Sequence, residues 1–318
     1  MKTLQITGLA GDSRQLDAET MDLLAAGLDG RLLYPDDDGY ADAIRLWNGM
    51  IKKRPAVAVR ARSTQDVVRT IDFARDNGLE LSVKGGGHNI AGLALSDGGV
   101  TLDMSAMNQV SVDLEARLAR VEPGCTLGDV DRATQAHGLA TTLGFVSETG
   151  VAGLTLGGGF GYLTRRFGWT IDDLQEVEIV TADGAVHRAS RSTNEELFWA
   201  LRGGGGNFGV VTEFVYRLHD VGPTVTAGLI AWPASEADAV LDLYRTVTDS
   251  APPELTLAVL MRNAPPAPWM PEHAHGTPII AMVVCHSGDP EQAKQDLAPI
   301  TSHAKQSRSS FPASATTS

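Results

Sequence analysis

Three glycine-rich segments carry the residues of this 318-residue chain that are best suited to chemistry. The first segment reads Gly85-Gly86-Gly87-His88-Asn89 and directly follows a predicted strand at residues 81–83. Three consecutive glycines let backbone N–H groups turn towards one point, and such a nest suits an anion such as a pyrophosphate. His88 would then lie at the edge of the bound group. The spacing alone leaves open the alternative of a tight turn followed by an ordinary loop histidine.

The second segment, residues 151–161, has the sequence V-A-G-L-T-L-G-G-G-F-G. Its small residues are Ala152, Gly153 and the glycines at 157–159, and they would let the backbone lie flat along an extended ligand. A glycine-kinked strand that crosses close to another strand is the alternative interpretation.

The third segment, residues 203–209, contains a literal GxGxxG at Gly204, Gly206 and Gly209. A Rossmann fingerprint must follow a strand and open a helix, whereas here a predicted helix precedes the motif and a predicted strand follows it. We therefore reject dinucleotide binding of the Rossmann type. The chain also lacks GxxxxGK[ST] and GxSxG, so neither a P-loop nor an α/β-hydrolase nucleophile is indicated.

Other groups with possible chemistry carry weaker signals. His273 and His275 lie in a proline-rich segment with Glu272 as the nearby carboxylate, which favours a surface loop, so we expect no metal site. Cys125 precedes a predicted helix, whose N-terminus could lower the pKa of the thiol. A small residue in a turn is the alternative for Cys125. It forms no CxxC pair with Cys285.

These segments need a frame of regular elements, and short strands and helices alternate along most of the chain. Ser63, with Asp66 three residues later, predicts the start of a helix that ends near Gly78. Thr193 with Glu196 predicts a second capping box, at the start of a helix over residues 195–202. Mixed strands, helices and hairpins are typical of an α+β fold. Predicted strands cover residues 57–59, 81–83, 100–103, 118–121, 177–180, 186–188 and 210–218, and a further helix covers residues 126–137.

The distribution of glycine divides the chain. Of its 34 glycines, 23 lie between Gly85 and Gly209, and their density falls sharply after Pro223. Beyond that point the pattern predicts strands at 226–232, 255–261 and 279–286 and helices at 235–250 and 290–297. The last 18 residues hold nine Ser or Thr and no apolar period, so we expect a disordered tail. The expected parts are an N-terminal segment (1–49), a glycine-rich domain (50–221), a second domain (222–300) and the tail (301–318).

Composition excludes several classes of protein. With 26 Lys and Arg against 39 Asp and Glu the net charge is −13, whereas a nucleic-acid-binding protein needs a basic face. The longest apolar run near the end, residues 279–285, is far shorter than the roughly 18 residues needed to span a membrane. The first five residues lack the apolar core of a signal peptide. We expect a cytoplasmic protein without nucleic-acid or membrane partners.

Taken together, the motifs resemble those of the FAD-linked oxidases of the vanillyl-alcohol-oxidase superfamily, specifically its berberine-bridge-enzyme-like branch. The resemblance spans residues 50 to 220. It implies an α+β fold with a two-subdomain PCMH-type FAD-binding domain at 50–221, followed by an incomplete antiparallel-sheet substrate domain at 222–300. The matching residues are Pro55-Ala56, the stretch 82–89, Asp97-Gly98-Gly99, the stretches 102–105 and 150–159, Arg166-Phe167-Gly168, Asp172-Asp173-Leu174 and the stretches 180–184 and 197–212.

The resemblance implies that FAD lies on the glycine segments, with its pyrophosphate on the loop at residues 85–87. The strips at 147–153 and 157–159 would pass along the flavin and its ribityl chain. Tyr162 would flank that region, and Val180 would lie near the adenine. The implied cofactor-binding residues are Lys84, Gly85, Gly86, Gly87, His88, Asn89, Ser147, Thr149, Gly150, Gly153, Gly157, Gly158, Gly159, Tyr162 and Val180.

The resemblance also implies a covalent flavin. His88 would bond to the 8α-methyl group of the flavin. Some relatives add a second bond through a cysteine, but Val146 stands at that place here, so a single attachment is expected. Asp173 departs from the Asn that relatives often carry.

For activity, the resemblance implies hydride transfer from a small organic substrate to flavin N5, with dioxygen reoxidising the flavin to give hydrogen peroxide. Relatives are longer, and their C-terminal segment carries an Asn near the flavin and often a Tyr that serves as base. Residues 223–318 hold no equivalent, so no catalytic residue is assigned. The alternatives are a truncated, catalytically silent FAD-binding fragment, a flavin dehydrogenase with another electron acceptor, and a binding module without flavin. The sequence indicates neither the substrate nor the oligomeric state.

Overall fold

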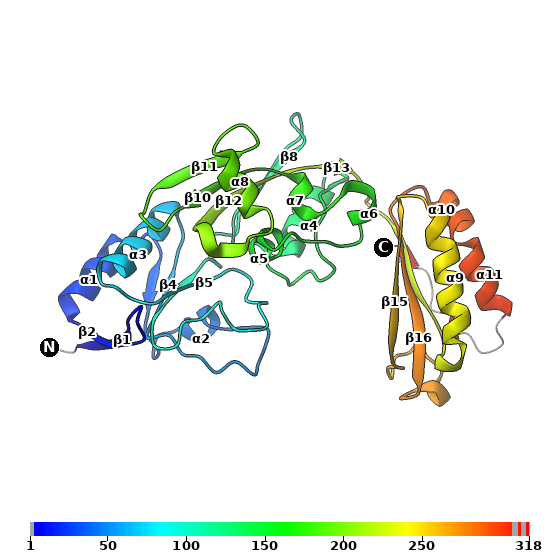
Figure 1. Cartoon of the computed structure of the whole chain (residues 1–318), viewed down its shortest axis with the longest axis horizontal. Helices are drawn as coiled ribbons and strands as arrows, with labels where there is room; N and C mark the ends of the chain where they lie inside the picture. Colours follow the sequence, from blue (N-terminus) through cyan, green and yellow to red (C-terminus); the bar gives the residue numbers. More distant parts are fainter. Residues whose placement is uncertain (1–2, 307–310, 313–315, 318) are drawn as a thin grey trace. The chain divides into compact units, whose positions relative to one another are not determined.

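The computed structural model of the chain describes residues 3–306, 311–312 and 316–317 (Figure 1). The chain forms two compact units. Unit 1 comprises Met1–His137, Thr141–Gly161 and Gly168–His219, and unit 2 comprises Gly138–Ala140, Tyr162–Phe167 and Asp220–Ser318. The main division, between His219 and Asp220, lies close to the boundary expected at residues 221 and 222. Each unit is described by itself below.

The first sheet of unit 1 combines parallel and antiparallel pairs. Strand β6 is parallel to both of its neighbours, β4 and β5, while β3 is antiparallel to β4. Parallel strands of one sheet need a crossover connection, and helix α3 (Thr64–Asp76) provides it between β4 and β5, which lie on either side of β6. The sheet order is β3 (Arg31–Leu33), β4 (Val57–Arg60), β6 (Val100–Asp103) and β5 (Leu81–Lys84).

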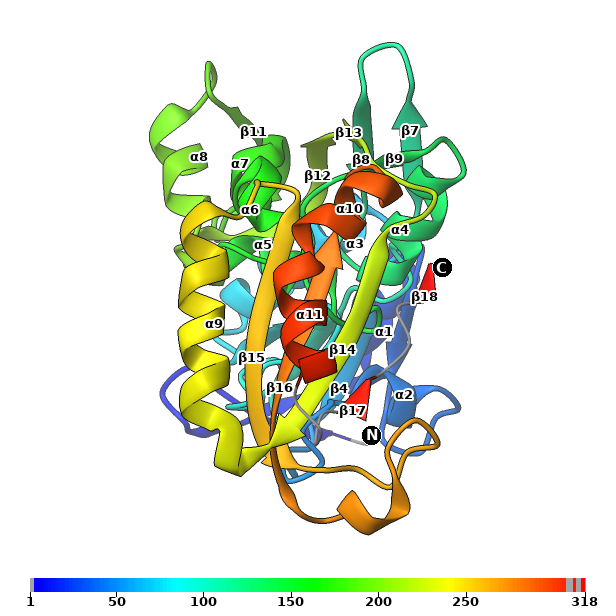
Figure 2. The same ribbon diagram turned by 90° about the vertical axis from the view of Figure 1, so that its right-hand side faces the viewer.

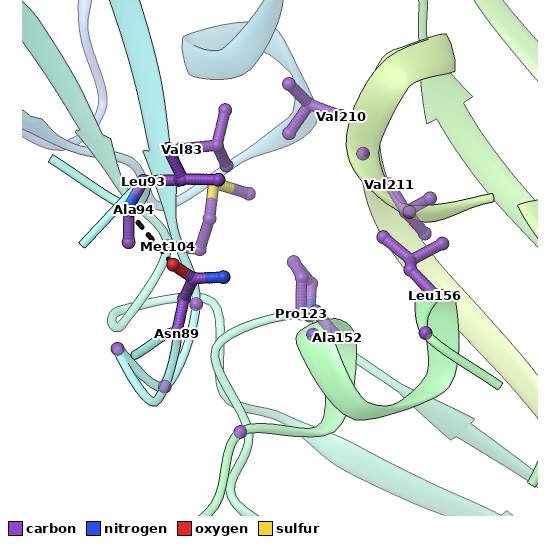
Figure 3. A pocket seen from close by; sticks show the side chains of 18 of the residues that line it. Val83, Asn89, Leu93, Ala94, Met104, Pro123, Ala152, Leu156, Val210 and Val211 are labelled. Atoms are coloured by element: carbon purple, nitrogen blue, oxygen red, sulfur yellow. Dashed lines mark hydrogen bonds between the residues drawn. The ribbon is translucent and has the colours of Figure 1, made fainter. Parts of the chain in front are cut away.

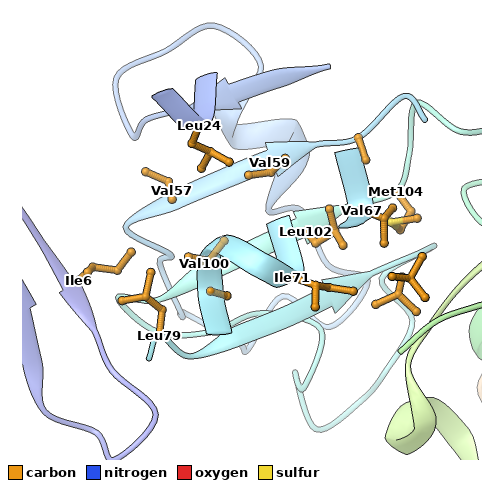
Figure 4. Packing of buried hydrophobic residues seen from close by; sticks show 14 of the residues in the cluster. Ile6, Leu24, Val57, Val59, Val67, Ile71, Leu79, Val100, Leu102 and Met104 are labelled. Carbon is orange, nitrogen blue, oxygen red and sulfur yellow. The ribbon is translucent and has the colours of Figure 1, made fainter. Parts of the chain in front are cut away.

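A hydrophobic core covers this sheet. Val57, Val59, Val100 and Leu102 are fully buried and pack against apolar residues of α3 and of helix α1 (Ala18–Gly27) (Figure 4). The side of α3 that carries Val67, Ile71 and Ala74, at positions i, i+4 and i+7, is the side buried here. The core therefore fixes β5, the strand that leads into the first glycine segment.

The second sheet of unit 1 is antiparallel throughout. Its order is β11 (Val186–Ser190), β10 (Leu174–Val180), β12 (Val210–Arg217), β8 (Leu118–Val121) and β7 (Val110–Asp113). Unit 1 also contains β1 (Leu4–Thr7), β2 (Ser13–Leu16), α2 (Tyr40–Ala43), α4 (Leu127–Gln135), α5 (Val151–Leu156), α7 (Thr170–Asp173), α8 (Glu195–Leu201) and a 3-10 helix (Gly205–Phe208).

Unit 2 is an antiparallel sheet with helices on one face (Figures 1 and 2). Strand β16 lies between β15 and β14, and the short strands β17 and β18 pair with β14. The elements are β14 (Thr226–Pro233), a 3-10 turn (Ala234–Glu236), α9 (Ala237–Ser250), β15 (Leu255–Asn263), a second turn (Glu272–Ala274), β16 (Pro278–His286), α10 (Pro290–Asp296), α11 (Ala298–Gln306), β17 (Phe311–Pro312) and β18 (Thr316–Thr317). Three short elements complete the chain: β9 (Leu139–Ala140), α6 (Thr164–Phe167) and β13 (His219–Asp220).

Most of the local signals in the sequence are confirmed. The Ser63 hydroxyl accepts a hydrogen bond from the backbone N–H of Asp66, and α3 begins at Thr64. Gly78, with φ of 59°, follows the end of this helix. Thr126 caps α4 in the same way and shares a full capping box with Asp129.

The capping box predicted at Thr193 is wrong. Helix α8 begins after Asn194, which has φ of 48° and makes no side-chain cap. The backbone carbonyl of Thr193 accepts from the N–H of Ser190 instead. Thr193 therefore closes the turn that leaves β11, and this turn sets the start of the helix.

The alternative interpretation of this segment as a glycine-kinked strand is wrong, because residues 151–156 form helix α5. Val151 and Thr155, one helical turn apart, are both fully buried, and Gly153 is tolerated between them. The glycines at 157–159 then end the helix.

The expected disordered tail begins too early, because α11 extends to Gln306. Leu297, Ile300 and Ala304 are buried against the sheet of unit 2, and their spacing follows one face of a helix. Residues 307–310, 313–315 and 318 of that expected tail lie outside the described residues. In the part of the chain that the structure describes, no helix is long and apolar enough to cross a membrane.

Candidate functional site

Unit 1 contains an open cavity of about 820 Å³ (Figure 3). This volume lies within the range of ligand pockets, roughly 300 to 1,000 Å³. Asn89 and Leu93 lie on one side of the cavity, and Leu156 and Val211 lie on the opposite side. The lining residues are 81–83, 85–89, 93–94, 104, 123, 149–150, 152–154, 156–157, 205–207 and 209–211.

The first glycine loop touches Gly150, which directly precedes the second glycine segment, at the wall of this cavity. A Cβ atom added at Gly86 would lie 2.4 Å from both the Cα and the N of Gly150. A Cβ added at Gly150 would lie 2.4 Å from the N of Gly86. No side chain fits in so short a separation, so this contact requires glycine at both positions.

The first glycine loop presents its backbone donors without partners. Within the described residues, the backbone N–H groups of Gly85, Gly86, Gly87 and His88 donate no hydrogen bond. Gly87 is buried and Gly85, Gly86 and His88 are partly buried, so four unpaired donors in succession at a cavity wall indicate a site for an acceptor-rich ligand. Gly153 and Gly206 add open space, since a Cβ at either position would meet nothing within 4 Å.

The cavity wall holds no Lys, Arg, Asp or Glu among the residues described. Lys84, which immediately precedes the loop, is buried and places its Nζ 2.9 Å from Oδ1 of Asp103. Arg60 Nε lies 2.8 Å from the other oxygen of Asp103, and the hydroxyl of Ser105 donates to that oxygen as well. This ionic cluster anchors the end of β5, so an anion in the cavity would be held by backbone dipoles.

His88 is half-buried at the cavity wall, and its ring stacks on that of Trp47 with 5.9 Å between centroids and 23° between planes. In the described structure the imidazole makes no hydrogen bond. Both ring nitrogens are therefore available to a ligand. Asn89, the next residue, accepts a hydrogen bond from the backbone N–H of Leu93 at 3.1 Å (Figure 3).

The structure brings together most of the residues that the sequence assigned to the site. Those that line the cavity are Gly85, Gly86, Gly87, His88, Asn89, Thr149, Gly150, Gly153 and Gly157. Those that lie outside its lining are Lys84, Ser147, Gly158, Gly159, Tyr162 and Val180.

The residues outside the lining have other structural roles. Gly158 and Gly159 accept backbone hydrogen bonds from Ile171 and Thr170, which joins α5 to α7. Val180 is fully buried in the core of unit 1. Tyr162 belongs to unit 2, where its carbonyl accepts from the Thr256 hydroxyl at 2.7 Å.

Sequence reasoning missed one wall of the cavity. Gly205, Gly206, Asn207 and Gly209 line it, although the segment was rejected as a Rossmann motif. Its element order is as predicted, with α8 before it and β12 after it, yet it faces the same cavity as the first glycine loop. The glycine content was the signal that could have marked it. The apolar wall residues, such as Met104, carried no signal distinct from that of a core residue.

Asp173 is fully buried and is held by several donors. His219 Nε2 lies 2.7 Å and Arg217 Nη2 lies 3.1 Å from its Oδ1, while the backbone N–H of Thr142 donates to Oδ2. Burial by itself would raise the pKa of this carboxyl, but the hydrogen bonds from His219, Thr142 and Arg217 outweigh it and lower that pKa. Asp173 is thus a structural anion of unit 1 and does not line the cavity.

The possible activation of Cys125 by a helix N-terminus is not found. Burial, with Asp129 and Glu122 nearby, raises the pKa of the Cys125 thiol to about 12. The residue is fully buried and follows the interpretation of a small residue in a turn. Among the described residues no three His, Cys, Asp or Glu side chains gather as a metal site would require.

Comparison with known proteins agrees with this geometry. Residues 55–190 match the FAD binding domain family. The (R)-6-hydroxynicotine oxidase of Paenarthrobacter nicotinovorans is 35% identical over 277 residues, which cover 85% of this chain and 58% of that protein. The structure of BBE-like 1 from Physcomitrella patens matches with a TM-score of 0.78 at 25% identity, over 89% of this chain and 59% of that one.

A third match bears on the cofactor. Glucooligosaccharide oxidase from Acremonium strictum, whose structure is described with a 6-S-cysteinyl, 8α-N1-histidyl FAD, has a TM-score of 0.78 at 28% identity. That match covers 94% of this chain and 61% of the oxidase. The chain thus spans 58–61% of the length of these three proteins.

The fold and the glycine-walled cavity, with these matches, define a flavoprotein with an FAD-binding domain. The chain belongs to the FAD-linked oxidases of the vanillyl-alcohol-oxidase superfamily, in the PCMH-type, berberine-bridge-enzyme-like branch. The α+β class and the PCMH-type domain expected from the sequence are confirmed.

Proposed function

We propose that this chain is an FAD-dependent oxidoreductase that carries its flavin covalently on His88 and oxidises a small organic molecule. The observation that carries the proposal is the cavity of unit 1, where a half-buried histidine without hydrogen bonds adjoins a loop of unpaired backbone donors. A single attachment is proposed because Val146 stands where some relatives have a second linking cysteine.

The residues at the cavity fit FAD in size and in charge. Backbone N–H groups of Gly85, Gly86 and Gly87 would hold the pyrophosphate, since the wall offers no cationic side chain. Thr149, Gly150, Gly153 and Gly157 would lie along the remainder of the cofactor, because their small size leaves room for it. Apolar wall residues such as Met104 and Val211 would exclude water from it.

When bound, FAD would supply the redox chemistry, taking a hydride from the substrate and passing the electrons to dioxygen with formation of hydrogen peroxide. This chain would bind the cofactor, fix its orientation through His88 and shield it. We further propose that the antiparallel sheet of unit 2 is part of a substrate domain and that its strands contribute to substrate specificity.

The covalent attachment can be tested by acid precipitation of the full chain purified with FAD. The wild-type pellet is expected to keep yellow, fluorescent flavin, and H88A is expected to release it to the supernatant. H137A is a matched control, because His137 is an exposed histidine of unit 1 outside the cavity lining. Complete release of flavin from the wild type contradicts the covalent bond, and the absence of flavin absorption in purified protein contradicts FAD binding itself.

Peroxide formation on panels of alcohols, sugars and amines tests the oxidase activity. Rapid reoxidation of the substrate-reduced flavin in air, with one peroxide formed per turnover, is the expected result. Slow reoxidation in air with fast reoxidation by an artificial acceptor would identify a dehydrogenase instead. Bound flavin that no substrate reduces would identify a catalytically silent FAD-binding protein.

A further inference from the structure

The contact between Trp47 and His88 joins two distant parts of the chain at the wall of the cavity. The two rings lie nearly parallel, 5.9 Å apart and 23° from coplanar. Trp47 is 67% exposed, so the burial of its own side chain does not explain its position. The contact instead places the indole in an offset stack against one face of the imidazole.

The backbone around Trp47 is attached to the glycine loop independently of the tryptophan side chain. The N–H of Trp47 donates to the carbonyl of Gly87 at 3.1 Å, and the Asn48 side chain donates to the carbonyl of Ile90 at 2.8 Å. These two bonds hold the loop on either side of His88. Gly87 has φ of 72°, and a Cβ there would lie 3.0 Å from the carbonyl of Arg45, so the two segments are in close contact.

Stacking determines how the imidazole can react. A ring stacked on one face of His88 restricts rotation of the imidazole, whereas the N–H and lone-pair directions of its two nitrogens lie in the ring plane and point away from the stack. No hydrogen bond in the described structure fixes either nitrogen. The Trp47 ring is therefore the contact that sets the plane in which a bond to nitrogen can form.

We infer that Trp47 is the positioning residue for covalent flavin attachment at His88. The inference rests on the proposed covalent FAD. In the net step an imidazole N–H bond and a C–H bond of the flavin 8α-methyl group break, and an N–C8α bond forms. The two hydrogens and two electrons released pass to dioxygen, which becomes hydrogen peroxide. The Trp47 side chain stacks on the imidazole and takes no part in the bonds that form and break, so its effect is on the rate of this step.

The test measures covalent incorporation over time in the full chain, produced in riboflavin-starved cells and then mixed with FAD in air. Samples are denatured at intervals, and protein-bound flavin fluorescence is read on a gel. The variants are W47F, which keeps an aromatic ring, W47L, which keeps apolar volume without a ring, and W47A. W199A is the control, because Trp199 is also an exposed tryptophan of unit 1 and does not line the cavity.

We expect wild type and W199A to incorporate flavin at the same rate and W47F to remain within about twofold of that rate. W47L and W47A should incorporate flavin about three- to tenfold more slowly than wild type, as the loss of an aromatic pair predicts. Reversible FAD binding and thermal unfolding, measured in parallel on H88A backgrounds, should change little. Equal rates for W47F and W47L overturn the inference even where W47A fails to fold. If wild type itself gains no covalent flavin, the covalent link of the proposed function fails and the inference fails with it. If wild type and W47L incorporate flavin equally fast, the inference fails alone.

Discussion

The ammonium group of Lys84 lies 2.9 Å from Oδ1 of Asp103, and both side chains are buried where strand β5 becomes the first glycine loop. Lys84 therefore forms an ion pair with Asp103 and does not line the cavity. Asp103 also accepts a hydrogen bond from Arg60 Nε on its second oxygen, so this buried carboxylate pairs with two cations. The stability of the loop depends on that anion.

The variant D103N tests this dependence. It leaves Lys84 and Arg60 without a counter-charge, and breaking a buried pair in this way costs about 3–5 kcal/mol. The free energy of unfolding should fall by that amount in urea denaturation followed by tryptophan fluorescence. D242N removes the partner of Arg245 in a pair whose side chains are 73% and 74% exposed, and it should cost less than about 1 kcal/mol. Equal losses in the two variants would contradict the anchoring role of Asp103.

The close contact between Gly86 and Gly150 and the open space beside Gly153 predict opposite effects on stability when each of Gly86 and Gly153 is replaced by alanine. In G86A the new methyl group would meet the Gly150 backbone at 2.4 Å, so overpacking should cost about 1–3 kcal/mol and weaken FAD binding. In G153A the methyl group meets no protein atom within 4 Å, and alanine favours helix α5 by roughly 0.5–1 kcal/mol.

The G153A variant should therefore unfold at the same or a higher temperature while binding FAD at least about fivefold more weakly, because its methyl group occupies cavity space. G49A, at another position with open space and outside the cavity, is the control and should leave both quantities unchanged. Thermal unfolding of the apoprotein and FAD titration on an H88A background provide the two measurements. Unchanged FAD affinity in G153A would argue against the cofactor lying beside that helix.

Asp173 predicts a particular dependence of stability on pH. Its pKa in the folded chain lies below the ordinary value of 3.8, so the ionised carboxylate stabilises the fold above that value, and this contribution disappears as pH falls through the folded pKa. D173N should lower the free energy of unfolding by about 1.5–3 kcal/mol at neutral pH, since the Asp173 carboxylate accepts a charge-assisted hydrogen bond from Arg217.

The difference between wild type and D173N should shrink as pH falls below about pH 4, where the Asp173 carboxylate becomes protonated. Urea denaturation above and below this pH measures the difference. D249N, which removes an exposed carboxylate of α9, serves as the control and should show no such convergence. A difference that grows as pH falls would have the wrong sign for this interpretation of Asp173.

The two cysteines should be inert in the folded protein. Burial raises the pKa of Cys125 to about 12 and that of Cys285 to about 11, so thiolate is scarce at pH 8. Compared with a free thiol, labelling by iodoacetamide should slow by at least about 1,000-fold at Cys125 and 100-fold at Cys285. Mass spectrometry after timed labelling, with a urea-unfolded sample as the reactive reference, gives both rates. Fast labelling of Cys125 in the native chain would show that it is not buried in solution.

Helix α11 should contribute to the stability of unit 2. Ile300 is fully buried against the sheet, and I300A should cost about 2–5 kcal/mol through lost contacts and the cavity left behind. S302A, an exposed change in the same helix, should stay within about 0.5 kcal/mol. Unfolding of unit 2 can be followed by Trp232, which packs in the same core. An effect of I300A as small as that of S302A would indicate that this segment is not packed.

Features that depend on neighbouring residues were predictable from the sequence. The capping of α3 by Ser63, its end near Gly78 and the glycine loop directly after β5 all follow from short-range geometry. Family resemblance then identified the FAD-binding domain. The prediction of a capping box at Thr193 was wrong because the carbonyl of Thr193 accepts a hydrogen bond from the N–H of Ser190 and closes a turn there. Residue types alone do not reveal this backbone bond.

Features that depend on distant residues were not predictable in this way. The wall at residues 205–211 comes from a segment whose local order, a helix and then a strand, gives no indication of what it faces. Trp47 precedes His88 by many residues, and no spacing rule relates them. The helical stripe of Leu297, Ile300 and Ala304 was present in the sequence, but it is shared between two segments that were interpreted separately.

Substitutions at the glycines of the cavity wall can change the cavity volume in one direction only. At Gly86, Gly150 and Gly153 the smallest side chain is already in place, so every substitution adds atoms and none can enlarge the space. Where the walls are apolar side chains, as at Met104 or Leu156, substitutions can change volume in either direction. Attempts to reshape the cavity for a bulkier flavin analogue should therefore vary Met104 and Leu156 and leave the glycines untouched.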